Sequence, residues 1–407
     1  LKRITFIPDK FHIYTPAPQD VELPDNEIRA LYIDKKQRIW TGSRDMNVSI
    51  YDARLRLLKR MKWGKVYAIM QDSAGVYWIS TKGQGLIKAI ETSQGNFKLQ
   101  HFKHKADDPY SLSNDNIYFT FQDSRQRLWV ATYGGGLNLI ETMPDGTLRF
   151  INHRNLLKRY PISHFYKVRH ITEDNQGRIW VSTTAGILQF KVSFHCPEEI
   201  DFHSICREQG NVNSLSNNDV IYTFESKKGE IYIITHSSGL NLVTSKNLLC
   251  DNIEFVHLNK QNGLPSDMAY TMIEGNRNEL WISFEDQICR YNPDRGSIES
   301  YNRFYFHSHL LVSEIPLVRD DKNGMYVALN RDVLYLHLDK LNKSSFIPHI
   351  VFTNASTGKN NKMGDSSPIV DQTLTLEKNE RDVSITFAAL DFAASGNLQY
   401  AYRLKNI

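Results

Sequence analysis

Aromatic and basic side chains gather in two sets of predicted loops, where they could bind a polar ligand that contains rings. An aromatic face can stack against a ring, while Lys, Arg and His donate hydrogen bonds to hydroxyl or carboxylate oxygens. The ten candidates are Arg44, Trp63, Lys65, Lys82, Tyr133, His164, Tyr166, Lys167, His236 and Tyr270. This is the chemistry of binding rather than of bond cleavage, so we expect no catalytic residue among them.

The histidines and cysteines form no recognisable catalytic or metal-binding pattern. The 14 histidines contain no HExxH motif, and the HxH pair of His307 and His309 stands alone, which favours an ordinary surface pair over a metal site. The four cysteines contain no CxxC pair. Cys196 and Cys206 could form a disulfide, although four separate thiols are the favoured interpretation. We therefore predict neither a cofactor nor a metal ion.

A repeat of about 48 residues must position the candidate loops. An aromatic residue marks its register at Trp40, Trp78, Trp129, Trp180, Tyr232, Trp281 and Tyr326. Asp stands six residues earlier in five of these seven copies, and Gly, Asn or Gln stands three residues earlier in all of them. An Asp that bonds the nearby backbone, followed by a residue that tolerates positive φ, predicts a tight hairpin turn. Period-two alternation then predicts an antiparallel meander of four strands in each copy.

Seven such meanders predict an all-β fold, with a seven-bladed β-propeller over residues 1–343. One meander cannot bury both of its faces, whereas radial stacking of the sheets does so. Residues 11–15 have no blade of their own, so we expect them to form the outer strand of the seventh blade and close the ring. In such a ring the two sets of loops share one end of the channel, which would bring the ten candidates together. Arg169 and His170 are expected on an inner strand near this channel, without a catalytic role.

The repeat stops after about residue 341, and residues 344–407 predict the truncated start of a second β domain. Residues 383–387 and 399–404 alternate as strands. Three or four strands cannot close a sandwich, so we expect a fragment of a longer protein. The first residue, Leu1, with no signal segment after it, favours the same interpretation.

The sequence resembles two known modules that follow one another. The runs LSNDN (112–116), FQD (121–123) and RLWVATYGGGLNLI (127–140) resemble the two-component regulator propeller repeat. The run ITFAALDFAASGNLQYAYRL (385–404) resembles the start of the Y-Y-Y domain, an immunoglobulin-like sandwich. Together they resemble the periplasmic sensor region of Bacteroides-type hybrid two-component systems. The later copies depart from the repeat motif, as at Ser226 and Gly275.

This resemblance implies a sensor that binds an oligosaccharide and signals to a cytoplasmic histidine kinase, which controls glycan-utilisation genes. It also implies a periplasmic location, a membrane link in the full-length protein and a homodimer that pairs through the sandwich region. The sequence contains no kinase, receiver or DNA-binding segment. We therefore expect no enzymatic activity and no direct nucleic-acid contact from this fragment.

The composition and net charge add little to these predictions. A net charge of +4 over 407 residues is too small and too scattered to indicate a nucleic-acid partner or, by itself, an acidic ligand. Two other functions stay open: a polysaccharide or antibiotic lyase on the same fold, and a protein-interaction scaffold. Cleavage of a bound saccharide would favour the lyase, and recovery of a partner protein without sugar would favour the scaffold.

Overall fold

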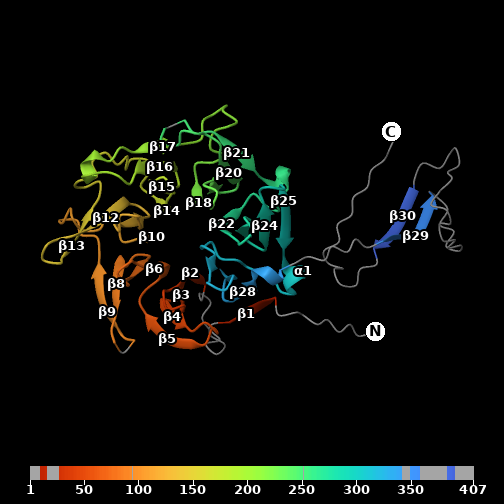
Figure 1. The fold of residues 1–407 in the computed structure, drawn as a ribbon, viewed down its shortest axis with the longest axis horizontal. Coiled ribbons are helices and arrows are strands. Elements are labelled where there is room, and N and C mark those ends of the chain that lie inside the picture. Colours follow the sequence, from red (N-terminus) through yellow and green to blue (C-terminus); the bar gives the residue numbers. More distant parts are fainter. Residues whose placement is uncertain are drawn as a thin grey trace. The chain divides into compact units, whose positions relative to one another are not determined.

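The first compact unit of the chain is a seven-bladed β-propeller (Figure 1). The computed structural model describes residues 10–15, 27–93, 95–250, 252–341, 349–357 and 383–389. These residues form seven four-stranded antiparallel sheets and one two-stranded sheet. The chain divides into one unit of residues 1–303 and 309–341 and another of residues 304–308 and 342–407. The predicted all-β, seven-bladed fold is thus confirmed.

The first four blades follow one another along the chain. Blade 1 contains β2 (Ile28–Ile33), β3 (Ile39–Ser43), β4 (Asn47–Tyr51) and β5 (Leu57–Lys62). Blade 2 contains β6 (Val66–Gln71), β7 (Tyr77–Thr81), β8 (Leu86–Glu91) and β9 (Phe97–Phe102). Blade 3 contains β10 (Ile117–Gln122), β11 (Leu128–Thr132), β12 (Gly136–Thr142) and β13 (Leu148–Ile151). Blade 4 contains β14 (Val168–Glu173), β15 (Arg178–Thr183), β16 (Gly186–Lys191) and β17 (His203–Ile205).

The remaining blades continue the series, and short helices lie between strands. Blade 5 contains β18 (Val220–Glu225), β19 (Ile231–Thr235), β20 (Gly239–Val243) and β21 (Phe255–Leu258). Blade 6 contains β22 (Ala269–Glu274), β23 (Leu280–Phe284), β24 (Ile288–Asn292) and β25 (Ser297–Tyr301). Blade 7 contains β26 (Val318–Arg319), β27 (Gly324–Ala328), β28 (Val333–His337) and β1 (Phe11–Tyr14). The described helices are α1 (Arg303–Phe306) and the 3-10 turns Pro197–Glu199, Lys260–Asn262 and Leu338–Lys340.

Strand β1 joins the two ends of the propeller. It pairs antiparallel with β28, with Phe11 opposite Leu336 and Tyr14 opposite Val333. The four-stranded order of blade 7 is therefore β1-β28-β27-β26, in which one strand comes from the start of the sequence and three come from its end. Residues 11–14 thus occupy the outer position expected of them, and the ring is closed by hydrogen bonds rather than by packing alone.

The seven register aromatics pack between neighbouring blades, as core residues rather than ligand contacts. All of them are at most 4% exposed. Trp40 of blade 1, for example, lies in one apolar cluster with Tyr77 and Ile79 of blade 2, and its ring stacks on Tyr77 with 4.4 Å between centroids. Burial of large aromatic side chains at each blade interface accounts for much of what holds the ring together.

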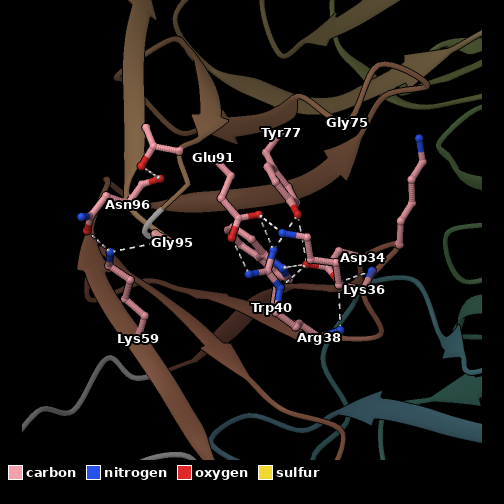
Figure 2. Close-up of polar contacts among 12 residues, drawn as sticks. Asp34, Lys36, Arg38, Trp40, Lys59, Gly75, Tyr77, Glu91, Gly95 and Asn96 are labelled. Atoms are coloured by element: carbon pink, nitrogen blue, oxygen red, sulfur yellow. Dashed lines mark hydrogen bonds and ion pairs between the residues drawn. The ribbon is translucent and has the colours of Figure 1, made fainter.

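The Asp of each repeat ties its hairpin turn to the buried aromatic. In blade 1 one carboxylate oxygen of Asp34 accepts hydrogen bonds from the backbone N–H groups of Lys36 and Arg38, both at 2.9 Å. The other accepts from Trp40 Nε1 at 2.8 Å, Arg38 Nε at 2.7 Å and the Tyr77 hydroxyl of blade 2 at 3.0 Å (Figure 2). The same Asp-to-Trp bond recurs in blades 2, 3 and 4 at 2.8–2.9 Å. The residue three places before the aromatic has positive φ in all seven turns, at Gln37, Gly75, Gln126, Gly177, Gly229, Asn278 and Asn323.

Blades 5 and 6 lack this Asp, and the polar contacts of their turns differ from those of the other blades. In blade 5, where Ser226 takes its place, the Tyr232 hydroxyl donates to Glu230 at 3.1 Å. In blade 6, Gly275 takes its place, and within the described residues the buried indole N–H of Trp281 has no hydrogen-bond partner. The departures seen in the sequence therefore change the polar contacts of the turn while the aromatic stays buried.

The second unit is described only in part. Strands β29 (Ile350–Thr357) and β30 (Val383–Ala389) form an antiparallel pair, and β30 includes the predicted strand 383–387. The predicted strand 399–404 lies outside the described residues. The assignment of residues 344–407 to a Y-Y-Y domain, and its boundary with the propeller at 343, stay predictions.

Two further features bear on the sequence predictions. All four cysteines are free thiols. Among the described residues, no helix is long and apolar enough to cross a membrane.

Candidate ligand-binding site

A β-bulge at the start of six of the seven inner strands directs a side chain toward the channel. In blade 1, Ile28 pairs with Ser43 and Ala30 pairs with Gly42, so the residue between them, Arg29, has no partner across the ladder. The register shifts at the same place in β6, β10, β14, β18 and β22. A bulge re-aims the extra side chain without breaking the strand. In chain order, the residues passed over are Arg29, Tyr67, Tyr118, Arg169 and Ile221, and in β22 both Tyr270 and Thr271 are passed over.

These bulges open onto a cavity in the channel with a volume of about 430 Å³. It is lined by the bulge residues Arg29, Tyr67, Tyr118, Arg169 and Ile221, by their neighbours on the inner strands and by residues 314–316 and 318 of blade 7. All seven blades therefore contribute to its wall. A concave space at the meeting point of many elements is the usual place for a small-molecule site.

Three tyrosines form a continuous aromatic platform on one side of this channel. The rings of Tyr67 and Tyr118 lie 4.9 Å apart, and those of Tyr118 and Tyr133 lie 4.6 Å apart with an 18° angle between their planes. An ammonium group sits at each end: Lys82 Nζ is 5.9 Å from the Tyr67 ring centre and Lys167 Nζ is 5.2 Å from that of Tyr133. Because the three rings stack on one another, with an ammonium group over Tyr67 and another over Tyr133, the platform presents ring edges, hydroxyl groups and positive charge within one small region.

Carboxylates hold three of the channel arginines in place. Glu27 bridges the Nε atoms of Arg29 and Arg44, each at 2.8 Å. Asp219 of blade 5 accepts from the terminal nitrogen of Arg169 at 3.0 and 3.1 Å. These pairs fix the guanidinium groups in position, and each guanidinium keeps N–H groups that these carboxylates do not occupy.

Tyr118, Tyr270 and His170 keep their neutral forms near pH 7. Burial raises the pKa of Tyr118, and the nearby Arg169 and Arg29 only partly offset this rise. Burial, assisted by Glu285, raises the pKa of Tyr270 to about 12. Burial lowers the pKa of His170 to about 3, where its ring lies between aromatic neighbours on the adjacent strands. Neutral tyrosines and a neutral histidine can exchange hydrogen bonds with a ligand, but none is poised as an acid or base at neutral pH.

Backbone hydrogen bonds join the two sets of loops at one end of the channel, as the sequence predicted. The N–H of Lys82 donates to the carbonyl of Lys65 at 2.8 Å, and the N–H of His236 donates to that of Asp219 at 2.8 Å. The same link connects Arg44 to Glu27 at 3.0 Å. The residue after each second strand therefore lies beside the residue before each inner strand.

The ten predicted site residues fall into three groups. Arg44 and Lys82 line the cavity, and Tyr133 and Lys167 belong to the platform. Tyr166, at 5.4 Å from Lys167 Nζ, is exposed beside it. Exposed side chains of the connecting loops are Lys65, His164 and His236. Buried side chains are Trp63 and Tyr270.

Trp63 requires a correction of its predicted place. It is 8% exposed and packs edge-on against Phe97 at 5.2 Å and near Trp40 at 6.3 Å. Its ring fills the core between blades 1 and 2 because the loop that carries it turns inward at Gly64, which has a φ of 113°. We therefore leave Trp63 out of the candidate site.

Sequence reasoning missed Arg29, Tyr67 and Tyr118, although a signal for them exists. Each stands eleven residues before the aromatic that marks the register of its repeat. Arg169, Ile221 and Tyr270 stand at the same offset. Comparing this single position across the copies would have identified the channel-facing residues, because a residue that varies in chemistry at a fixed place in a repeat is a candidate for function rather than for packing.

Comparison with known proteins agrees with the fold and identifies the repeat. Residues 22–45, 111–134 and 165–185 match the two component regulator propeller family. The protein is thus a seven-bladed propeller that carries two-component regulator propeller repeats, with matched segments in blades 1, 3 and 4.

A curated relative, histidine kinase P4 of Formosa agariphila, is 22% identical over 307 residues. These residues make up 71% of this chain and 21% of the relative, so the chain spans about a fifth of the length of that protein. Virginiamycin B lyase from Staphylococcus aureus has a TM-score of 0.55 and 14% identity, with 80% of this chain and 98% of the lyase covered. An extracellular domain of a hybrid two-component system from B. thetaiotaomicron has a TM-score of 0.45 and 15% identity, with 89% and 60% covered. At 14% identity, the likeness to the lyase shows the fold alone.

Proposed function

We propose that this propeller is the extracytoplasmic ligand-sensing region of a hybrid two-component sensor and that it binds an oligosaccharide at its channel. The observation that carries the proposal is the platform of Tyr67, Tyr118 and Tyr133 beside a cavity of about 430 Å³. The regulator repeats and the histidine kinase relative support the sensor role. In this proposal the chain lies in the periplasm, and the full-length protein is linked to the membrane and controls glycan-utilisation genes through its kinase.

The platform suits a sugar better than a fully apolar ligand. One face of a pyranose ring presents C–H groups that pack on an aromatic ring, while its hydroxyl groups need hydrogen-bond partners around the rim. The edges of the stacked Tyr67 and Tyr118 rings supply apolar surface, and the hydroxyl and ammonium groups around them supply those partners. The cavity has room for a short saccharide segment, with longer chains extending from the channel end.

Binding would signal by shifting the population of two arrangements of the sensor. A ligand shifts such an equilibrium only by its difference in affinity for the two states. A homodimer that pairs through residues beyond the propeller would give those two states, and this pairing is part of the proposal. A sensor of this kind needs no chemical step in the propeller itself.

The lyase alternative predicts a different fate for the ligand. Elimination needs a base that is unprotonated at neutral pH and positioned beside the bond that breaks. His170 is neutral and lines the cavity, but it is packed between Phe119 at 4.6 Å and Tyr222 at 4.1 Å, which leaves its ring little freedom to reach a substrate. We therefore favour binding without cleavage.

The test is a thermal-shift screen with plant, host and microbial oligosaccharides, followed by calorimetry on those that stabilise the protein. Tyr118→Ala should weaken binding by about tenfold, because it removes about one to two kcal/mol of contact with the aromatic ring. Tyr110→Ala, a half-buried tyrosine outside the channel, is the matched control and should leave the affinity unchanged.

Mass spectrometry of the recovered saccharide then separates sensing from catalysis. An unchanged saccharide supports the sensor, and a shortened or unsaturated product would establish the lyase instead. Equal loss of affinity in the Tyr118 and Tyr110 variants would remove the channel from consideration as the site.

A further inference from the structure

Positive charge is concentrated on the wall of the channel cavity, although it is diluted over the chain as a whole. Four basic side chains line the cavity, namely Arg29, Arg44, Lys82 and Arg169, with Glu314 as the acidic one. Glu27 and Asp219 pair with the three arginines, so four cations face three carboxylates and a single positive charge is in excess. The net charge of the 407 residues is only +4. Low-dielectric walls focus such a local excess, so the cavity attracts anions more strongly than the net charge suggests.

Two of these cations have hydrogen-bonding capacity that the described residues leave unused. The Nε–H of Arg169 is buried and has no hydrogen-bond partner among the described residues, although a terminal nitrogen of the same side chain pairs with Asp219. The ammonium group of Lys82, an exposed side chain, lies 5.9 Å from the centre of the Tyr67 ring and has no hydrogen-bond or ion-pair partner in the part of the chain that the structure describes. The buried N–H of Arg169 is costly to leave without a partner, and an anionic ligand would supply one to both cations.

The two cations flank the same aromatic surface. Lys82 lies over Tyr67 at one end of the platform, and Arg169 comes from the neighbouring bulge position, within electrostatic range of the Tyr118 hydroxyl. Both side chains line one cavity with these tyrosines. Across the channel, Glu285 and Glu314 act on Tyr270 of blade 6, so the opposite wall repels an anion. The channel therefore has a preferred side for a negative group.

We propose that the saccharide bound here is acidic, with a carboxylate or sulfate group held between Lys82 and Arg169 while a sugar ring lies against the edges of the stacked Tyr67 and Tyr118 rings. This inference rests on the proposed function and names the chemical class of its ligand. The charge-assisted hydrogen bonds to the two cations select the acidic saccharide, and the tyrosines recognise its ring.

The experiment measures binding to a glycan array that carries acidic and neutral saccharides, followed by calorimetry with matched pairs. Trigalacturonic acid is compared with galactotriose, and a sulfated dextran trisaccharide is compared with isomaltotriose, so that the two pairs distinguish carboxylate from sulfate. We expect binding to the acidic members, with an affinity that falls as salt is raised from about 50 to about 500 mM.

Four variants assign the effect to the channel. Lys82→Gln and Arg169→Gln should each weaken acidic binding by about tenfold or more, since each removes a hydrogen bond from a charged group. Lys98→Gln, on the outer strand of blade 2, and Arg125→Gln, at the hairpin turn of blade 3, are exposed matched controls and should change nothing. Thermal unfolding of each variant checks that the ring stays intact.

A fifth variant works in the opposite direction and cannot be mistaken for structural damage. Asp219→Asn removes the carboxylate that competes for Arg169 and keeps the backbone carbonyl that accepts from His236. If an anion binds Arg169, this variant should bind the acidic saccharide about threefold more tightly or better, because the competing charge is gone. A merely structural role for the ion pair predicts weaker or equal binding.

Each result decides a separate question. Equal binding of acidic and neutral saccharides, or acidic binding that survives both Lys82→Gln and Arg169→Gln, overturns the inference and leaves the sensor proposal intact. Failure of every saccharide on the array overturns the proposed function, and the inference falls with it.

Discussion

Replacing Asp34 by Ala should destabilise the propeller far more than the loss of one small side-chain group suggests. The Asp34 carboxylate is fully buried and accepts two backbone hydrogen bonds from its own turn. It also accepts from the side chains of Arg38, Trp40 and Tyr77, the last of which belongs to the next blade (Figure 2). The variant therefore disconnects a turn, a buried indole and a blade interface in one step.

The expected magnitude follows from what is left unpaired. Removing one partner of a buried ion pair costs about 3–5 kcal/mol, because the other charge and its donors stay buried. Glu91 limits the loss, since it binds the terminal nitrogens of Arg38 at 2.7 and 2.9 Å and keeps that guanidinium paired. An unfolding entropy of about 2.1 cal/mol/K per residue, over about 340 residues, turns this cost into a fall in Tm of about 4–7 °C.

Asp52→Ala is the matched control. Asp52 accepts the same local bonds in the β4–β5 turn, from the N–H groups of Arg54 and Arg56 and from Arg56 Nε, but its side chain is 22% exposed and binds no tryptophan. Calorimetry and urea unfolding of both variants should show a large loss for Asp34 and a small one for Asp52. Equal losses would mean that the turn alone matters, and the argument from buried side-chain bonds would be refuted.

Three further outcomes are expected from the same measurements. Trp129→Phe should cost about 1–3 kcal/mol more than Trp281→Phe, because the first indole donates to an Asp and the second has no partner among the described residues. The wild type should lose stability as the pH falls from 6.5 toward 3, because the unfolded state binds a proton that buried His170 does not; His170→Phe should abolish this part of the loss in pH-dependent melts. Gly85→Ala should cost several times as much as Gly95→Ala: both glycines have positive φ, but a Cβ at Gly85 would lie 2.0 Å from a backbone oxygen, while nothing lies within 4 Å at Gly95.

The blades could be predicted from the sequence because each copy of the repeat contains similar residues at the same spacing. The Asp, the residue with positive φ and the register aromatic recur at fixed spacing, and hairpin turns, strand alternation and core packing all follow from them. The closing strand at residues 11–14 was also predictable, because an extended segment without a blade of its own has only one open edge to pair with.

The site was harder to predict because its residues differ from copy to copy. Loop position correctly placed Arg44 and Lys82 beside the channel, yet the same reasoning placed the core residue Trp63 there too. Whether a loop side chain turns outward or inward depends on tertiary contacts such as the Trp63–Phe97 edge, and these have no signature in local spacing. The bulge residues escaped notice because an inner strand was expected to be a regular ladder.

In the proposed function, the two ends of the propeller would divide stability from recognition. The Asp of each Asp-to-Trp turn stands five residues after the bulge residue of the same inner strand, so the anchor of the turn and the bulge residue lie at different ends of that strand. A bulge side chain has no partner across the ladder, so strand pairing constrains its chemistry less than that of its neighbours. The bulge residues are accordingly Arg, Tyr, Tyr and Arg in blades 1 to 4 and Ile in blade 5. If the channel binds the ligand, exchange of one residue in each inner strand would change its specificity, while the turns that hold the ring together stay as they are.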